Sequence, residues 1–213
     1  MRIEVWGDLV CPWCYIGKRR LERALEALPD GAETEVVFRS FQLDPMAPAH
    51  RAQLQLHVLM ERYGLSEVRA RALEDETALT AHAEGLEFEV EGRLSGNTFD
   101  AHRLVHLAKA SGLMDAVVER FYRAQFAEAR SLFDRDSLVE LAGEAGLDRE
   151  ESLEVLAGDR YAAAVLAEAE EARELGATGV PFTVIDRRFG ISGAQSPAVF
   201  GSAIAEARAR ASD

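Results

Sequence analysis

The sequence is short of cysteine, of positive charge and of long hydrophobic stretches. The last two shortages argue against nucleic-acid binding and against a membrane-spanning helix. Its 213 residues include two cysteines and carry 24 lysines and arginines against 37 aspartates and glutamates, a formal net charge of −13. This balance argues against nucleic acid as a partner, because binding to phosphates requires clustered basic side chains. No apolar run approaches the roughly 20 residues of a membrane-spanning helix, so we expect no membrane association.

Low complexity and internal repeats are also missing, which argues against a solenoid. A hydrophobic content of 48% excludes a disordered or fibrous chain, and the length is ample for a core without disulfide cross-links. Residues 1–6 show no basic segment followed by an apolar one, so we expect no export and a cytoplasmic location. A structural disulfide would be unusual in that compartment.

The N-terminal pattern predicts a strand, a helix and a second strand within about forty residues. Residues 2–6 alternate polar and apolar types, apolar positions at helical spacing run from Cys14 to Leu28, and residues 35–41 form the next strand pattern. Such a unit usually contains a parallel strand pair joined by a right-handed crossover.

The long middle of the chain is predicted to be helical. Ser66 is positioned to cap one helix, Asn97 or Thr98 the next, and Asp148 with Glu151 resembles a capping box. Strand patterns return only at 182–185 and 189–193, followed by a final helix that starts at Ser196-Pro197.

The predicted order is therefore βαβ, a helical block, and ββα. This is a compact α/β core interrupted by one insertion. We place the core at residues 1–46 and 176–213 and an all-helical insertion domain at 47–175.

The two cysteines lie in the sequence Cys11-Pro12-Trp13-Cys14, where a strand passes into a helix. Pro12 suits the first helical position because it has no N–H to lose there. Cys11 then faces the unpaired N–H groups and the positive end of the helix dipole, which favour its thiolate. Cys14 lies one turn further and can close a disulfide with Cys11. The pattern indicates a redox pair in which Cys11 attacks and Cys14 resolves the mixed disulfide.

Metal binding and incidental thiols are the alternatives to redox chemistry. A structural zinc site needs about four cysteine or histidine ligands, and the sequence has no second CxxC. A permanent disulfide across so short a loop would add little stability. We therefore predict no metal at Cys11 and Cys14.

Four segments together resemble the DsbA-like thioredoxin-fold oxidoreductases, specifically their FrnE-like cytosolic branch. The resemblance covers essentially the whole chain and implies a thioredoxin fold with a large helical insertion. The segments are Asp8 to Lys18 around the cysteines, Asn97-Thr98-Phe99-Asp100-Ala101-His102-Arg103-Leu104, Gly179-Val180-Pro181-Phe182, and Gly190-Ile191-Ser192-Gly193-Ala194-Gln195.

The resemblance further implies that Val180-Pro181 is a cis peptide packed beside the cysteines. The spacing alone favours an ordinary trans proline, because only about 5–6% of X–Pro bonds in folded proteins are cis. In the implied arrangement, the backbone of Val180 binds a substrate strand and Pro181 keeps competing donors and metals away from the sulfurs.

Further residues are candidates for substrate binding or tuning. Trp13, between the cysteines, is expected near solvent as a docking residue, and Pro12 and Asp8 are expected to tune the thiols. The resemblance makes Asn97, Thr98 and His102 possible substrate contacts, although ordinary helix packing is the simpler interpretation of His102. The charged runs at 18–20 and 168–171 are interpreted as solvated faces.

We conclude that the sequence predicts a thiol–disulfide oxidoreductase acting on protein or small-molecule substrates, as a monomer or a dimer. No bound cofactor is expected, since the two sulfurs hold the electrons, and glutathione or thioredoxin would recycle them. One alternative is a glutathione-dependent isomerase or transferase of the 2-hydroxychromene-2-carboxylate isomerase type, although those enzymes typically lack the resolving cysteine. The other is a non-enzymatic holdase or binding module.

Overall fold

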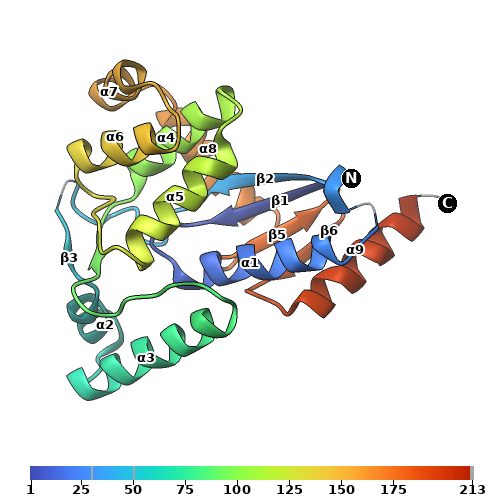
Figure 1. Cartoon of the computed structure of the whole chain (residues 1–213), viewed down its shortest axis with the longest axis horizontal. Helices are drawn as coiled ribbons and strands as arrows, with labels where there is room; N and C mark the ends of the chain where they lie inside the picture. The colour runs from blue at the N-terminus through green and yellow to red at the C-terminus, as the bar shows by residue number, and fades with distance from the viewer. Residues whose placement is uncertain (30, 50, 212–213) are drawn as a thin grey trace. The chain divides into compact units, whose positions relative to one another are not determined.

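A computed structural model describes residues 1–29, 31–49 and 51–211 of the chain (Figure 1). The chain forms two compact units. Met1–Leu43 and Leu166–Asp213 make one, which we call the sheet unit, and Asp44–Val165 make the other, the helical unit.

The sheet unit contains a four-stranded sheet in the order β2-β1-β5-β6. Strand β1 (Arg2–Gly7) pairs in parallel with β2 (Glu35–Ser40), and helix α1 (Pro12–Glu26) and the short 3-10 helix η1 (Gly31–Glu33) connect them. Strand β5 (Phe182–Ile185) runs antiparallel to β1, and β6 (Phe189–Ser192) completes a hairpin with β5. This βαβ and ββα arrangement is the predicted thioredoxin fold.

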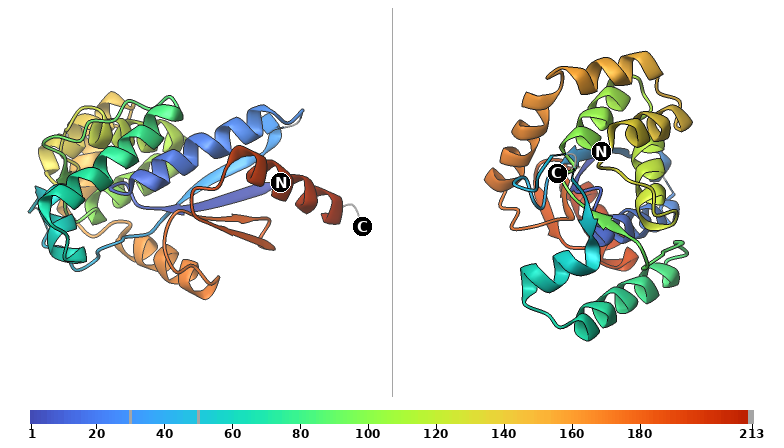
Figure 2. Two further views of the ribbon diagram at one scale, coloured as in Figure 1. Left: turned by 90° about the horizontal axis from the view of Figure 1, so that it is seen from below. Right: turned by 90° about the vertical axis from the view of Figure 1, so that its left-hand side faces the viewer.

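Helices cover both faces of this sheet. Helices α1 and α9 (Pro197–Ala211) lie side by side on one face (Figure 1). Their shared core includes Ile3, Leu21, Ile185, Phe200 and Ile204. Helix α8 (Ala162–Glu174) lies on the opposite side of the sheet from α1 (Figure 2, left), where Ala172 packs with Trp6, Phe182 and Val184.

The helical unit contains six helices among the residues that the structure describes. They are α2 (Gln55–Tyr63), α3 (Glu67–Ala83), α4 (Phe99–Ala110), α5 (Met114–Phe126), α6 (Arg135–Glu144) and α7 (Arg149–Ala157). Ser66 and Asp148 cap α3 and α7 as predicted, because their side chains accept hydrogen bonds from the third residue along. Helix α4 is the most buried helix of the unit, with seven buried residues among its twelve.

Two features differ from the predicted insertion. It is not wholly helical, since β3 (Gln53–Leu54) and β4 (Leu94–Ser95) form a short antiparallel ladder. The compact units also divide at 43/44 and 165/166, earlier in the chain than the boundaries we placed at 46/47 and 175/176. Most of α8 thus belongs to the sheet unit, because its apolar side packs on Trp6.

None of the described helices is both long enough and apolar enough to cross a membrane.

Candidate active site

The two cysteines lie at the start of α1, directly after β1 and its connection. Cys11 is the N-cap residue with extended backbone angles (φ −89°, ψ 114°), and Pro12 occupies the first helical position. The Cys11 N–H donates to the carbonyl of Asp8 at 3.1 Å, and the Cys14 N–H donates to that of Cys11 at the same distance. The local sequence therefore folds as predicted, and it places both thiols in the first turn of one helix.

Both thiols are free and buried, but their surroundings differ. Cys11 is 5% exposed and Cys14 is 2% exposed. Burial raises the pKa of the Cys14 thiol well above its usual value, and a hydrogen bond with the Cys11 side chain raises it further. Cys14 is therefore held as a neutral thiol, while Cys11 has the helix N-cap position.

The peptide bond between Val180 and Pro181 is cis, as the resemblance implies. The Cys11 Sγ atom lies 3.9 Å from the Val180 carbonyl oxygen, a contact that joins positions 169 residues apart in the sequence. The Gly193 N–H donates to the Pro181 carbonyl at 2.8 Å. The first contact places Val180 beside Cys11, and the hydrogen bond joins Pro181 to the residue that follows β6.

Asp8 is buried in the connection between β1 and α1. Its carboxylate accepts a hydrogen bond of 2.7 Å from the Leu43 N–H. Asp8 acts on Cys14 in two opposite ways, since a backbone hydrogen bond from Asp8 lowers the pKa of the Cys14 thiol and its negative charge raises it. The structure therefore places Asp8 within electrostatic range of the second thiol.

Of the aromatic side chains near the cysteines, Trp13 is exposed and its neighbours are not. Trp13 has 42% of its surface exposed, whereas Tyr15 and Phe182 belong to the buried core. Trp13 therefore has the exposure that docking requires, and Tyr15 and Phe182 do not.

Of the three residues that the resemblance makes substrate contacts, His102 lies on α4, and Asn97 and Thr98 directly precede this helix. Thr98 and His102 are buried within the helical unit, and their contact with substrate stays a prediction. Asn97 is half-buried, and its side chain donates to the Ala47 carbonyl at 2.8 Å and accepts from the Phe99 N–H at 2.9 Å.

A buried acidic residue that we assigned to a solvated face lies close to the active-site connection. The Glu168 carboxylate pairs with Arg39 at 2.6 Å and accepts from the Ser40 N–H at 2.7 Å, and its own carbonyl accepts from the Trp6 indole at 2.8 Å. Glu168 thereby joins α8 to the ends of β1 and β2. Its spacing from Val165 and Ala172, both buried, could have indicated an inward position.

The described part of the chain contains no group of three or more histidine, cysteine, aspartate or glutamate side chains arranged to hold a metal ion.

Solved structures share this fold along the whole chain. A probable DsbA oxidoreductase from Streptomyces coelicolor is 50% identical, with a TM-score of 0.95 over 98% of this chain and 90% of that one. The cytosolic disulfide reductase DsbM from Pseudomonas aeruginosa, also solved with glutathione, is 20% identical, with a TM-score of 0.65 over 99% of both chains.

A 2-hydroxychromene-2-carboxylate isomerase is 15% identical, with a TM-score of 0.70 over 100% of this chain and 98% of that one. At these lower identities the likeness concerns the fold alone. The family model for the DSBA-like thioredoxin domain matches residues 2–205. With its thioredoxin sheet and its paired thiols at the start of α1, the chain belongs to the DSBA-like thioredoxin family of oxidoreductases.

Proposed function

We propose that the protein is a thiol–disulfide oxidoreductase in which Cys11 is the nucleophile and Cys14 the resolving thiol. The observation that carries the proposal is the placing of two free thiols in one helical turn, with only Cys11 at the helix N-cap. Cys11 thus has the N-cap position before Pro12, the place that the proposal gives to the attacking sulfur. Burial instead keeps Cys14 protonated until the first step has occurred.

Reduction of a substrate then proceeds by two exchanges. The Cys11 thiolate attacks one sulfur of a substrate disulfide, forms a mixed disulfide and releases the other substrate sulfur as a thiolate, which takes up a proton. Cys14 loses its proton and attacks the Cys11 sulfur, so the second substrate thiol leaves and a Cys11–Cys14 disulfide remains. Two electrons have passed from the protein to the substrate. The reverse sequence oxidises a dithiol substrate.

The residues around the cysteines have supporting roles in this proposal. Val180 presents its backbone to an extended substrate, Pro181 excludes competing groups from the sulfurs, and Trp13 offers an exposed apolar surface for docking. Asp8 and Pro12 tune the thiols through charge and helix geometry. Asn97, Thr98 and His102 remain predicted substrate contacts.

Substrates and recycling partners are proposed by chemical class. Protein or small-molecule disulfides and thiols are the substrates, and glutathione or thioredoxin returns the Cys11–Cys14 pair to its working state, so no bound cofactor is needed. We place this activity in the cytoplasm, because both cysteines of the chain serve the redox pair and neither is used in a structural disulfide. The 50% identical Streptomyces protein, described as a probable DsbA oxidoreductase, supports the same class of reaction.

Reduction of insulin disulfides tests the proposal. Wild-type protein should catalyse the reaction, Cys11→Ser should reduce the rate to the uncatalysed background, and Cys14→Ser should accumulate a mixed disulfide because the resolving thiol is missing. The two variants are matched controls, since each removes one of the two sulfurs in the same turn. A Cys11→Ser variant as active as wild type would overturn the proposal.

The isomerase-like alternative predicts a different result. Its support is the shared fold of the chromene-carboxylate isomerase, and the presence of Cys14 counts against it. A glutathione-dependent isomerisation that survives in Cys14→Ser, in a protein without disulfide exchange activity, would favour this alternative. Suppression of client aggregation by a variant lacking both cysteines, again without exchange activity in wild type, would favour a holdase.

A further inference from the structure

Gly17 lies where α1, the Pro181 segment and the loop after β6 meet. A Cβ atom at this buried glycine would lie 3.2 Å from Pro181 Cγ and 3.4 Å from Ala194 Cβ. A contact of 3.2 Å between carbon atoms is closer than the 3.5–4.0 Å of optimal packing. Any side chain at position 17 would therefore push the proline ring away from the helix.

Two hydrogen bonds hold the same three segments together. The Arg20 guanidinium on α1 donates to the Ala194 carbonyl at 2.6 Å, and the Gly193 N–H donates to the Pro181 carbonyl at 2.8 Å. The loop at 193–194 is thus attached to α1 on one side and to Pro181 on the other. The distance between α1 and Pro181 is fixed by this attachment and by the missing side chain at Gly17.

The distance between α1 and Pro181 affects where the Val180 backbone lies relative to the Cys11 sulfur. Cys11 caps the helix that carries Gly17, and Val180 immediately precedes Pro181, with its carbonyl oxygen 3.9 Å from the Cys11 Sγ. A displacement of Pro181 away from Gly17 would move the Val180 backbone relative to Cys11. Backbone groups of this segment are also the ones that the proposed function assigns to substrate binding.

Helix formation does not explain a glycine at this position, because glycine destabilises a helix interior relative to alanine. We propose that Gly17 is a positioning residue for thiol–disulfide exchange, which sets the approach of the Pro181 segment to α1 and so the place of the Val180 carbonyl beside Cys11. The inference deepens the proposed function and rests on it.

The chain offers a matched control for a substitution at Gly17. Gly201 lies within α9 of the same unit, and a Cβ built there has no atom within 4 Å outside its own helix and its chain neighbours. Gly201→Ala therefore makes the same chemical change, with the same gain in helix propensity, but without a contact to the active-site segments.

The test compares Gly17→Ala with Gly201→Ala in three measurements: the rate of insulin disulfide reduction, the equilibrium constant with glutathione, and the thermal unfolding midpoint. Since a misplacement of about 1 Å can cost about 100-fold in rate, a shift of a few tenths of an ångström should lower the rate of Gly17→Ala about 3- to 10-fold. Its equilibrium constant with glutathione should change as well. Gly201→Ala should match wild type in both. Equal rates and equilibrium constants in the two variants would overturn the proposal.

A second variant, Arg20→Met, tests the proposal if Gly17→Ala does not fold. It removes the hydrogen bond to the Ala194 carbonyl and should lower the rate about 2- to 3-fold. Arg19→Met is the charge-matched control, because Arg19 pairs with Glu22 on the helix surface, and it should retain the wild-type rate. Identical rates for the two arginine variants would contradict the proposed contact.

The two proposals fail in different ways. A wild-type protein without disulfide exchange activity overturns the proposed function and the role of Gly17 together. An active wild type accompanied by an equally active Gly17→Ala overturns only the role of Gly17.

Discussion

Two buried carboxylates, Glu4 in the sheet unit and Glu74 in the helical unit, are equally shielded from solvent and have pKa values displaced in opposite directions. Glu4 is 2% exposed and Glu74 is 3% exposed. For both groups burial is the largest single influence and raises the pKa. The pKa of Glu4 nevertheless lies below its usual value, whereas that of Glu74 lies above it.

The charged groups around each carboxylate account for this difference. Glu4 on β1 accepts hydrogen bonds of 2.9 Å from both Arg39 and Arg187, and these two cations together outweigh the cost of burial. Glu74 on α3 pairs with Arg93. The charge and hydrogen bond of Arg93 and the charge of Arg71 do not offset the desolvation, to which the negative charge of Asp75 adds. Burial therefore has the larger effect on Glu74, and its pKa stays above the usual value.

The two arginines that pair with Glu4 each pair with a second carboxylate as well. Arg39 pairs with Glu168, Arg187 pairs with Glu171, and both guanidinium groups lie about 6 Å from the Trp6 ring. Arg93, in contrast, has its guanidinium within 5.4 Å of the rings of the buried Phe88 and Phe126. The buried Glu4 of the sheet unit thus shares its two arginines with Glu168 and Glu171, whereas the buried Glu74 of the helical unit pairs with Arg93.

The largest expected effect follows from removing the carboxylate of the Glu74–Arg93 pair. Glu74→Ala leaves the Arg93 cation buried without that carboxylate and should cost about 3–5 kcal/mol of unfolding free energy, as is usual for a broken buried ion pair. Glu4→Ala should cost less, about 1–3 kcal/mol, because Arg39 and Arg187 keep Glu168 and Glu171. Urea unfolding followed by circular dichroism measures both values.

Glu76→Ala is the control for this comparison, since Glu76 is an exposed residue on the same helix as Glu74. Its cost should stay within about 0.5 kcal/mol. If Glu4→Ala costs as much as Glu74→Ala, then shared partners do not protect a buried charge in this protein.

A second prediction uses the opposite pKa displacements of Glu4 and Glu74. Because the pKa of Glu4 is lower in the folded state, its stabilising contribution is present above the unfolded pKa and is lost as the pH falls through the folded value. The pKa of Glu74 is higher in the folded state, so its contribution to stability decreases as the pH rises from the unfolded to the folded value.

The glutamine variants should therefore change the acid sensitivity of the protein in opposite senses. Relative to wild type, Glu4→Gln should lose less stability on acidification from pH 7 to pH 4, and Glu74→Gln should lose more. Urea midpoints measured across that range test both signs. A change of the same sign in the two variants would contradict the pKa assignment of one of them.

Strand and helix patterns predicted most of the sheet unit but not its charged cluster. The alternation of residues 2–6 places Glu4 on the face opposite Ile3, and in an isolated strand that face would be exposed. Helix α8 covers it in the structure, and Glu168 joins the cluster from that helix. Local periodicity cannot show which distant helix covers a sheet face. The sequence analysis therefore did not identify Glu4 and Glu168 as buried residues.

The sequence predicted the parts of the candidate site that depend on local structure and did not predict those that depend on distant residues. The place of Cys11 and Pro12 follows from local helix-capping physics, which short sequence patterns record well. The cis geometry at Pro181 came from family resemblance, because no local pattern distinguishes cis from trans there. Gly17 could not have been selected, since its meaning depends on Pro181 and Ala194, which lie more than 160 residues away.

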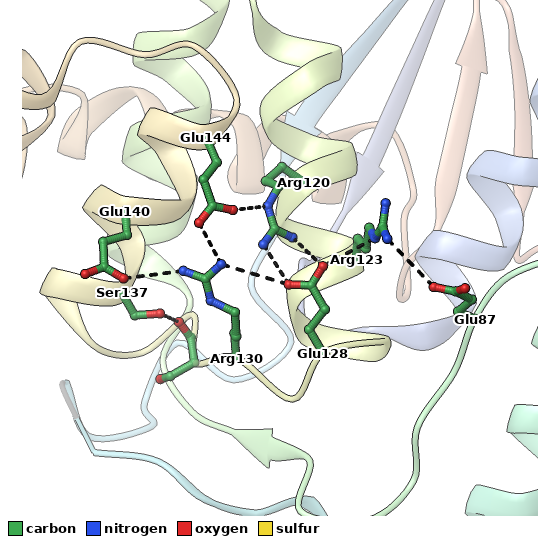
Figure 3. A network of polar contacts seen from close by, with 9 residues as sticks. Glu87, Arg120, Arg123, Glu128, Arg130, Ser137, Glu140 and Glu144 are labelled. Carbon is green, nitrogen blue, oxygen red and sulfur yellow. Dashed lines mark hydrogen bonds and ion pairs between the residues drawn. The ribbon is translucent and has the colours of Figure 1, made fainter.

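A third charge cluster separates the effect of shared partners from the effect of burial. On the surface of the helical unit, Arg120 pairs with Glu128 at 2.6 Å and with Glu144 at 2.7 Å, and Arg130 pairs with Glu144 at 2.7 Å (Figure 3). The charges are shared as they are around Glu4, but the carboxylates lie close to water. Solvent screens such pairs, so each contributes little to stability.

The smallest expected effect is therefore that of Arg120→Met, which removes the shared guanidinium and keeps a side chain that can pack. Its cost should stay below about 1 kcal/mol, and it should fall further in 1 M NaCl, where the screening length is about 3 Å. Glu74→Ala should cost nearly the same at both salt concentrations, because the Arg93 cation that it leaves behind is buried. A salt-independent cost of several kcal/mol for Arg120→Met would mean that the connectivity of a charge cluster, rather than its depth, determines its contribution to stability.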